Sequence, residues 1–293
     1  MKLKIKVFFI TVLFVITAIA SPIFEVTGTC IESAAAKSAK QILEVDFIDV
    51  GVGDCILISR GSHGILIDAA LNEAVPKIKS VIDSRKIKKL DYLIGTHPHE
   101  DHIYGLDDII RSYPVGKLIM PDKSVTHKCY TDVVKAAKEK NLAITNPVLG
   151  VPYNFYGAKF TFFAPNSTIY DNLNDYSIVT KLTFENTSFL FAGDAQDVSE
   201  KEMLNNGYDL KSDVLKVGHH GSGTSTTDEF LNAVRPRFAV ISVEKNNDHS
   251  LPDKKILNKL ANIGAKVYRT DLDGTITVQS DGSSISFNKE KAG

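Results

Sequence analysis

One short motif constrains this chain more than any other feature, because it places four potential metal ligands directly after an apolar segment. The segment Tyr92–Thr96 has the composition of a buried strand, and the motif that follows it reads His97-Pro98-His99-Glu100-Asp101-His102. Side chains two residues apart on an extended segment point the same way, so His97 and His99 share one side. Asp101 and His102 open the next helix and face the same mouth. Imidazoles with a carboxylate suit Zn or Mn, and an exposed polar turn is the alternative interpretation.

Polar groups follow apolar strand-like segments at two further places in the chain. Phe189–Ala192 is followed by Gly193-Asp194, and Val214–Val217 is followed by Gly218-His219-His220-Gly221-Ser222. Sandwiches and α/β sheets build their sites at strand ends. The sequence therefore predicts that these carboxylate and imidazole groups join the first cluster.

The remaining pattern predicts an α/β domain with two sheets. Strand-like runs rich in Val, Ile, Phe and Thr lie at 43–48, 54–59, 64–68, 92–96, 117–120, 159–164, 177–184, 188–192, 213–217, 238–243, 266–269, 275–279 and 284–287. Apolar residues at helical spacing lie between them at 75–82, 103–110, 133–137 and 256–260. The simplest architecture is two mixed β-sheets packed face to face with helices outside. The content of 43% hydrophobic and 24% charged residues excludes a disordered or fibrous chain.

The first 20 residues have the form of a secretory signal peptide. Three lysines precede an apolar run, and Ala18-Ile19-Ala20 matches a cleavage site. We expect cleavage near Ala20, a linker over 21–42, a hydrolase domain over 43–290, and a secreted, extracellular product without a stable membrane partner. Anchoring by an uncleaved segment is the alternative.

The net charge and the cysteines give weaker constraints. The 34 basic and 35 acidic residues leave a net charge of −1, so no global charge points to a nucleic acid, although a local basic groove is still compatible with that value. Three cysteines do not form a complete disulfide framework. Cys55 lies in an apolar pattern typical of a core, and a bridge between Cys30 and Cys129 is one arrangement.

The order of these motifs resembles the metallo-β-lactamase fold hydrolases, and within them the ComEC/Rec2-type branch. That branch comprises the soluble domain of competence DNA-uptake proteins and stand-alone relatives. The resemblance covers about residues 43–288. It rests on the motif at 97–102 and on six further blocks, which are Asp49–Ile58, Ile65–Asp68, Asn174–Val179, Phe191–Asp194, Lys216–Ser222 and Tyr268–Ile276. The implied fold is an αββα sandwich.

The resemblance also implies roles for individual residues. The metal-ligand candidates for two divalent ions, Zn or Mn, are His97, His99, Asp101, His102, Asp194 and His219, with Asp194 bridging. The catalytic candidates are Asp101, Asp194, His220 and His249, and Asp68 would orient a ligand histidine. The motif leaves open which of the two adjacent histidines binds metal and which assists catalysis.

Two positions depart from the pattern of the family. Classic β-lactamase relatives carry a further first-metal histidine before the bridging aspartate, and here that interval contains only His127, in a polar stretch typical of a solvated loop. The first metal would then be bound more weakly. His249 is retained in Asn247-Asp248-His249-Ser250, where the branch usually has Tyr-Gly-His-Pro. We expect it to contact a phosphate or to donate a proton.

Two classes of function are compatible with this pattern. The first is a two-metal hydrolase of a phosphodiester, which would be DNA, RNA or a phosphocholine ester on wall teichoic acid. The second is a non-catalytic binding module of the same fold, and the complete set of candidate ligands argues against it. Hydrolysis of a β-lactam or a thioester is disfavoured by the absent histidine.

Overall fold

A computed structural model describes residues 42–291 of the chain. The predicted signal peptide, residues 21–41 of the predicted linker, and Cys30 lie outside the described residues. Cys55 and Cys129 are buried free thiols. No helix within residues 42–291 is both long and apolar enough to cross a membrane.

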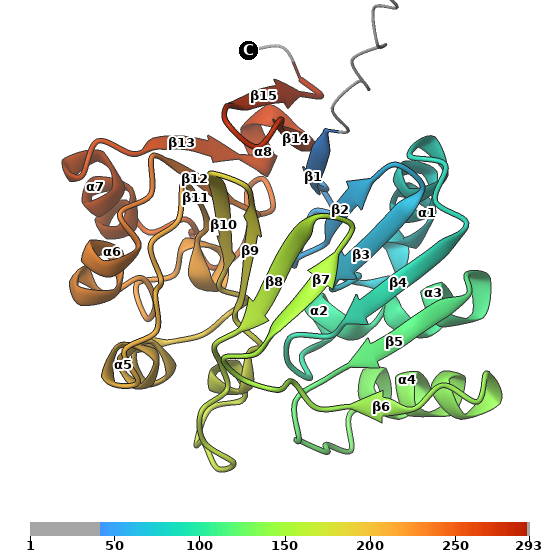
Figure 1. The fold of residues 1–293 in the computed structure, drawn as a ribbon. Helices are drawn as coiled ribbons and strands as arrows, with labels where there is room; N and C mark the ends of the chain where they lie inside the picture. Colours follow the sequence, from blue (N-terminus) through green and yellow to red (C-terminus); the bar gives the residue numbers. More distant parts are fainter. Residues whose placement is uncertain (1–41, 292–293) are drawn as a thin grey trace, which may run out of the picture. The chain divides into compact units, whose positions relative to one another are not determined.

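Two mixed β-sheets form the centre of the domain (Figure 1). The eight-stranded sheet has the order β15-β14-β1-β2-β3-β4-β5-β6, with bounds Ile285–Lys289, Ile276–Ser280, Leu43–Phe47, Ile56–Arg60, His63–Ile67, Lys89–Ile94, Val115–Ile119 and Ile144–Thr145. The seven-stranded sheet has the order β13-β12-β11-β10-β9-β8-β7, with bounds Lys266–Arg269, Phe238–Ile241, Val214–Lys216, Thr187–Phe191, Thr180–Phe184, Ala158–Phe162 and Pro152–Phe155. Each sheet is parallel in one half, β3 to β6 and β10 to β13, and antiparallel in the other. The predicted pair of mixed sheets is confirmed.

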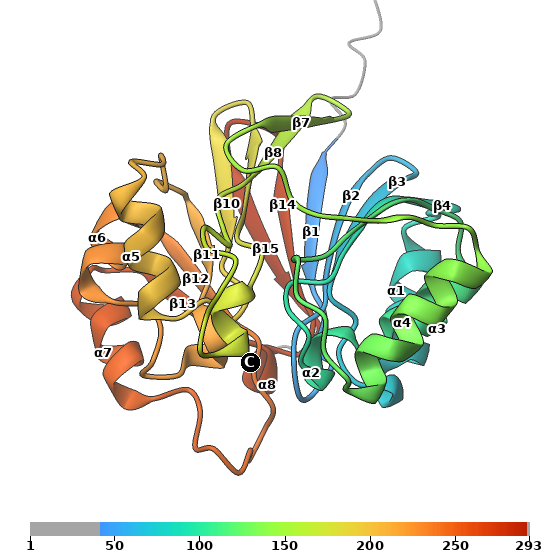
Figure 2. The ribbon, with the colours of Figure 1, turned by 90° about the horizontal axis from the view of Figure 1, so that it is seen from below.

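Helices cover the outer face of each sheet (Figure 2). On the first sheet they are α1 (Val75–Ser84), α3 (Leu106–Ser112) and α4 (Lys128–Glu139), and on the second they are α5 (Asp197–Asn205), α6 (Asp228–Val234) and α7 (Lys254–Asn262). The short helices α2 (Glu100–Ile103) and α8 (Thr270–Asp273) lie at strand ends. The layers are therefore those of the predicted αββα sandwich.

The hydrophobic core follows these layers. Strand β10 shows why, because its side chains alternate between two faces. Phe189 and Phe191 pack into the cluster between the sheets, whereas Leu190 packs into the cluster under the outer helices. Strands buried on both faces need continuous apolar runs, which is the pattern that the sequence shows here.

The predicted helix over 103–110 is interrupted. It forms α2 and α3, with Tyr104 and Gly105 between them. A Cβ atom on Gly105 would lie 2.4 Å from the carbonyl oxygen of Ala69, so the two segments approach too closely for any other residue. This contact fixes α2, and with it the end of the histidine motif, against the segment that follows β3.

Candidate metal centre

The predicted site residues come together at the ends of four strands. His97 follows β4, Asp68 follows β3, Asp194 follows β10, and His220 follows β11 within the short helix η3 (Gly218–Gly221). In both sheets these are parallel strands, so their carboxyl ends lie at the same edge. The topology thus brings together residues that are more than 120 positions apart in the chain.

Four residues form the tightest group. The ligand atoms of Asp101, His102, Asp194 and His220 all lie within 4.8 Å of one another. The Oδ2 atom of Asp194 is 3.2 Å from Nε2 of His102 and 3.5 Å from Nε2 of His220. The latter nitrogen is also 3.3 Å from Oδ2 of Asp101. Two imidazoles and two carboxylates at this spacing match the donor set of a divalent-metal site.

His97 and His99 lie beside this group. Nε2 of His97 is 3.0 Å from Nδ1 of His99 and 3.9 Å from Oδ2 of Asp194. His97 is completely buried, and its Nδ1 atom lies 3.3 Å from Oγ of Ser177. The same Oγ atom accepts a hydrogen bond from the backbone N–H of Asp194, at an N–O distance of 3.0 Å. One serine therefore links both residues at the centre of the site.

Asp68 lies behind His102, a histidine of the motif. Its Oδ2 atom is 2.8 Å from Nδ1 of His102. The same carboxylate accepts the backbone N–H of Thr96 at 2.8 Å and its hydroxyl at 2.7 Å. A histidine that donates from Nδ1 presents Nε2 as an acceptor, which is the orientation that a metal requires.

The adjacent histidines take different positions. His220 is buried within the four-residue group, whereas Nε2 of His219 is 3.9 Å from Oδ2 of Asp194 and faces the amide of Asn174 at 3.4 Å. Both have positive φ angles, 48° for His219 and 53° for His220. Non-glycine residues adopt this conformation at a cost, and such residues cluster at functional sites. The geometry thus places His220, rather than His219, among the candidate ligands.

Burial and neighbouring charges shift the pKa values of the cluster. Burial, helped by His102, lowers the pKa of His97 well below its usual range. Burial acts to lower the pKa values of His102 and His220, but the negative charges of Asp194 and Asp101 have the larger effect. The pKa of His102 is therefore raised well above its usual range, and that of His220 is raised to about 10. Burial acts to raise the pKa of Asp194, yet the two imidazoles hold it well below normal. The group therefore attracts positive charge, and a bound metal would displace the two protons.

Unpartnered atoms test whether these residues fit a metal. Buried polar atoms normally have hydrogen-bond partners. Among the described residues, several at this site have none, and they are His102 Nε2, His220 Nε2, Asp194 Oδ1, Asn174 Oδ1 and Asp54 Oδ1. The first three belong to the four-residue group. The atoms of His102, His220, Asp194 and Asn174 fit a pair of divalent ions, which would satisfy them.

Asn174 is a candidate ligand that the sequence analysis did not assign. It lies in the short helix η2 (Leu173–Tyr176), its side chain is buried, and its Oδ1 atom has no hydrogen-bond partner. It lines the same pocket as His99 and Asp194. The resemblance includes this block, but only the fold shows that Asn174 lines this wall of the site with an amide oxygen that has no hydrogen-bond partner.

An open pocket of about 790 Å³ gives access to the cluster. His99, Asp101, Asp194, His219 and His220 lie in its wall, together with His249, which is exposed on the loop before α7. The structure thus places His249 at the mouth. His127 is exposed just before α4 and is not among the residues that line the pocket.

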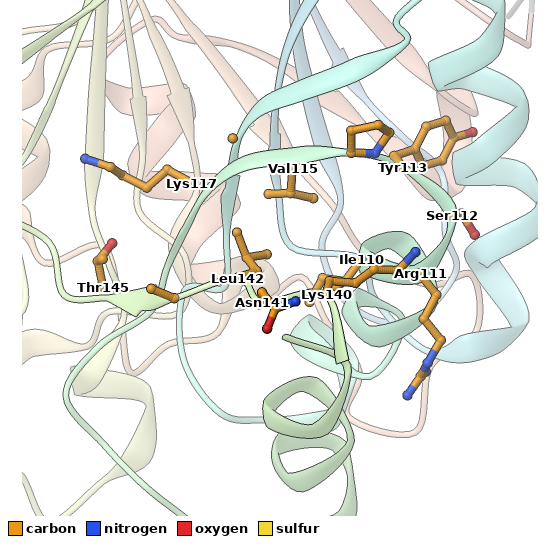
Figure 3. Close-up of a pocket in the computed structure, with 13 residues that line it drawn as sticks. Ile110, Arg111, Ser112, Tyr113, Val115, Lys117, Lys140, Asn141, Leu142 and Thr145 are labelled. Atoms are coloured by element: carbon orange, nitrogen blue, oxygen red, sulfur yellow. The ribbon is translucent and has the colours of Figure 1, made fainter. Parts of the chain in front are cut away.

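A second pocket of about 770 Å³ lies at the opposite ends of β5 and β6, where these strands begin (Figure 3). Arg111 and Lys117 line it and point away from each other. Arg111 is already paired with Asp107 and Glu139. None of the predicted site residues lines this pocket, so the metal cluster and its mouth are the candidate functional site.

The fold and the cluster define an αββα domain with a candidate metal centre at the strand ends. Residues 48–244 match the family model described as the metallo-beta-lactamase superfamily, which is more than half of the chain. The chain therefore belongs to the metallo-β-lactamase superfamily.

Two relatives specify the branch. ComE operon protein 3 of Bacillus subtilis is 32% identical over 255 residues, covering 80% of this chain and 32% of that protein. Recombination protein 2 of Haemophilus influenzae is 28% identical over 249 residues, covering 82% of this chain and 29% of that protein. The predicted ComEC/Rec2-type resemblance is confirmed, and the chain spans about a third of the length of these relatives.

Solved structures of low sequence identity share the fold. The metallo-beta-lactamase fold protein YhfI of Bacillus subtilis superimposes with a TM-score of 0.54 at 12% identity, covering 81% of this chain and 100% of that one. CmlA, a diiron beta-hydroxylase of Streptomyces venezuelae, gives a TM-score of 0.55 at 15% identity, covering 81% of this chain and 54% of that one. At these identities the likeness concerns the fold alone.

Proposed function

We propose that this chain is a two-metal hydrolase that cleaves phosphodiesters. The observation that carries the proposal is the convergence of ligand atoms from Asp101, His102, Asp194 and His220 within 4.8 Å of one another, beside an open pocket. His102, Asp194 and His220 each have a buried polar atom there without a hydrogen-bond partner. When bound, two divalent ions supply Lewis-acid activation of water and of a phosphoryl oxygen. Zn or Mn is the expected metal, as the sequence analysis proposed.

The residues divide between two metal positions. His97, His99 and Asn174 would hold the first ion, and the four-residue group of Asp101, His102, Asp194 and His220 would hold the second. Asp194 would bridge them, because its Oδ2 atom faces imidazoles of both sets, at 3.9 Å for His97 and 3.2 Å for His102. In this proposal the roles predicted for His219 and His220 are exchanged, so that His219 is the one free to contact substrate.

Two histidines would act on the substrate. The ring of His219 is fixed by Nδ1, which lies 3.0 Å from the hydroxyl of Thr224. The residue lines the pocket, and its Nε2 lies 3.4 Å from the amide of Asn174 and 3.9 Å from Oδ2 of Asp194. It is placed to contact a phosphoryl oxygen. His249, at the mouth, is placed to protonate the leaving group, which is general acid catalysis. The backbone N–H of His219 donates to the carbonyl of Gly193, at 3.1 Å, and this bond ties the two loops together.

The assay that tests the proposal compares two substrates on metal-reconstituted protein. We expect hydrolysis of bis(p-nitrophenyl) phosphate and little hydrolysis of nitrocefin. His249→Ala should slow turnover by roughly 10²–10⁴-fold, the usual range for a general acid, and leave metal content unchanged. Fast nitrocefin cleavage without phosphodiesterase activity would contradict the proposed substrate class, and unchanged turnover of the variant would remove His249 from the mechanism.

A second readout addresses the first metal position. Asn174→Ala should reduce the bound metal from two ions towards one, because it removes the amide oxygen that completes the weaker site. Asn174→His should strengthen zinc binding there, since it introduces the imidazole that other superfamily members carry. Metal content by elemental analysis and affinity by calorimetry measure both effects. Asn186→Ala, in an exposed turn, is the control, and equal metal binding by Asn174→Ala and the wild type would exclude Asn174 as a ligand.

The pocket lining favours one alternative substrate within the same class. None of the described residues that line the pocket is Lys or Arg, whereas Glu100, Glu244 and Asp248 add carboxylates around the mouth. Negative charge repels a polyanion and attracts a cationic group. These charges favour a phosphocholine ester of teichoic acid over DNA or RNA as the substrate. The assay should therefore include p-nitrophenyl phosphorylcholine beside single- and double-stranded nucleic acids.

A further inference from the structure

A buried ion pair lies directly behind the candidate metal centre. The side chain of Lys216, at the end of β11, has no exposed surface, and Nζ lies 2.8 Å from Oδ2 of Asp54. The same ammonium donates to the backbone carbonyl of Val217 at 2.9 Å. Transferring two charges from water into the protein interior costs free energy, and a pair of apolar residues in their place often gives a fold that is equally stable or more stable. A lysine buried to this degree therefore calls for a reason beyond folding.

Asp54 touches two members of the four-residue group. Its Oδ1 atom lies 3.6 Å from Nδ1 of His220, and its backbone N–H donates to the carbonyl of Asp101 at 3.2 Å. Nδ1 of His220 lies 3.0 Å from the carbonyl of Ser242. The carboxylate of Asp54 and the carbonyl of Ser242 thus both face Nδ1, and together they direct Nε2 towards Asp101 and Asp194, where the second metal would bind.

The carboxylate of Asp54 is also a potential competitor. Its ligand atom lies within 4.8 Å of those of Asp68 and His102, so these three residues form a second group of donors. Without the ammonium of Lys216, Asp54 would be a buried, uncompensated charge, free to turn towards His220 or to bind a cation itself. The ion pair at 2.8 Å holds the carboxylate in place and neutralises it.

We infer that Lys216 and Asp54 are positioning residues, which hold His220 with Nε2 directed at the second metal position and keep Asp54 from acting as a competing ligand. This inference rests on the proposed two-metal site. It predicts that the pair determines metal affinity at the second position more than it determines the stability of the fold.

A double-variant cycle on the full chain separates these two effects. Lys216→Met alone should lower the melting temperature of the metal-free protein, because it leaves Asp54 charged, buried and unpaired. Asp54→Asn combined with Lys216→Met removes both charges and should restore that melting temperature. We expect the double variant to bind the second ion about 10–100-fold more weakly than the wild type, the usual effect of disturbing the partners of a metal ligand. Calorimetric titration with Zn or Mn measures this affinity.

The control is Lys181→Met. Lys181 is another nearly buried lysine of the same sheet, and it pairs with Asp209 at 2.9 Å, outside the pocket. The Lys181→Met variant should bind metal at both positions with the affinity of the wild type. If the double variant does not fold, Asp54→Asn alone is expected to weaken the second site in the same way. Wild-type metal affinity in the folded double variant, or in Asp54→Asn, would overturn the inference, whereas a wild-type protein that binds no metal would instead contradict the proposed function.

Discussion

Replacement of Asp194 by alanine is expected to abolish hydrolysis and to remove bound metal from both positions. One oxygen of this carboxylate lies within 3.9 Å of imidazole nitrogens of His97, His102 and His220. Without it, two cations would face each other with no bridging negative charge, and their repulsion in a buried site is strong. The measurements are turnover of bis(p-nitrophenyl) phosphate and elemental analysis of the metal-loaded protein.

The neighbouring Asp197→Ala is the matched control for this variant. Asp197 lies three residues further on, exposed in the first turn of α5, and it is not among the residues lining the pocket. It should retain metal and activity. The backbone N–H of Asp194 remains bonded to Ser177, so the loop itself should keep its shape in Asp194→Ala. Hydrolysis at the wild-type rate by Asp194→Ala would contradict a bridging role.

The strand ends that carry the site could be predicted because each one combines two local signals. A buried apolar run identifies the strand, and a cluster of polar groups identifies its end, as at His97 and Asp194. Three of the elements that the sequence analysis missed lack such signals. Strand β6 has two residues, and β7 begins with a proline and is half exposed. Helix α5 buries Ser199 and Glu200 beside Met203, so it has no apolar stripe to recognise.

The finer features of the site depend on tertiary contacts and could not be predicted from local pattern. Adjacent histidines look equivalent in sequence, and only the fold shows that His220 joins the four-residue group while His219 faces the amide of Asn174. Asn174 becomes a candidate ligand only because it lines the pocket and its Oδ1 atom has no hydrogen-bond partner. Lys216 occurs in an apolar strand. The partner of this lysine, Asp54, lies 162 positions earlier in the chain, so only the fold shows that the two residues form an ion pair.

Gly53→Ala is expected to disrupt both the fold and the second metal position. Gly53 has a φ of +95°, and a Cβ atom there would lie 1.7 Å from the carbonyl oxygen of Asp101. Neither backbone can yield without moving Asp101, whose carboxylate belongs to the four-residue group, and Asp54, whose N–H donates to that carbonyl. Overpacking typically costs roughly 1–3 kcal/mol. We expect Gly53→Ala to lower the free energy of unfolding by more than this and to remove the second metal.

Gly51→Ala separates backbone conformation from steric contact. Gly51 belongs to the same loop and also has a positive φ, +73°, but no atom lies within 4 Å of the position that a Cβ would take there. Its substitution should therefore cost only the left-handed conformation, about 1–2 kcal/mol, and leave metal binding intact. Chemical denaturation and calorimetric metal titration measure both variants. Equal effects of the two substitutions would show that the approach of Gly53 to Asp101 does not position the metal ligand, because the shared backbone conformation would then account for the whole loss.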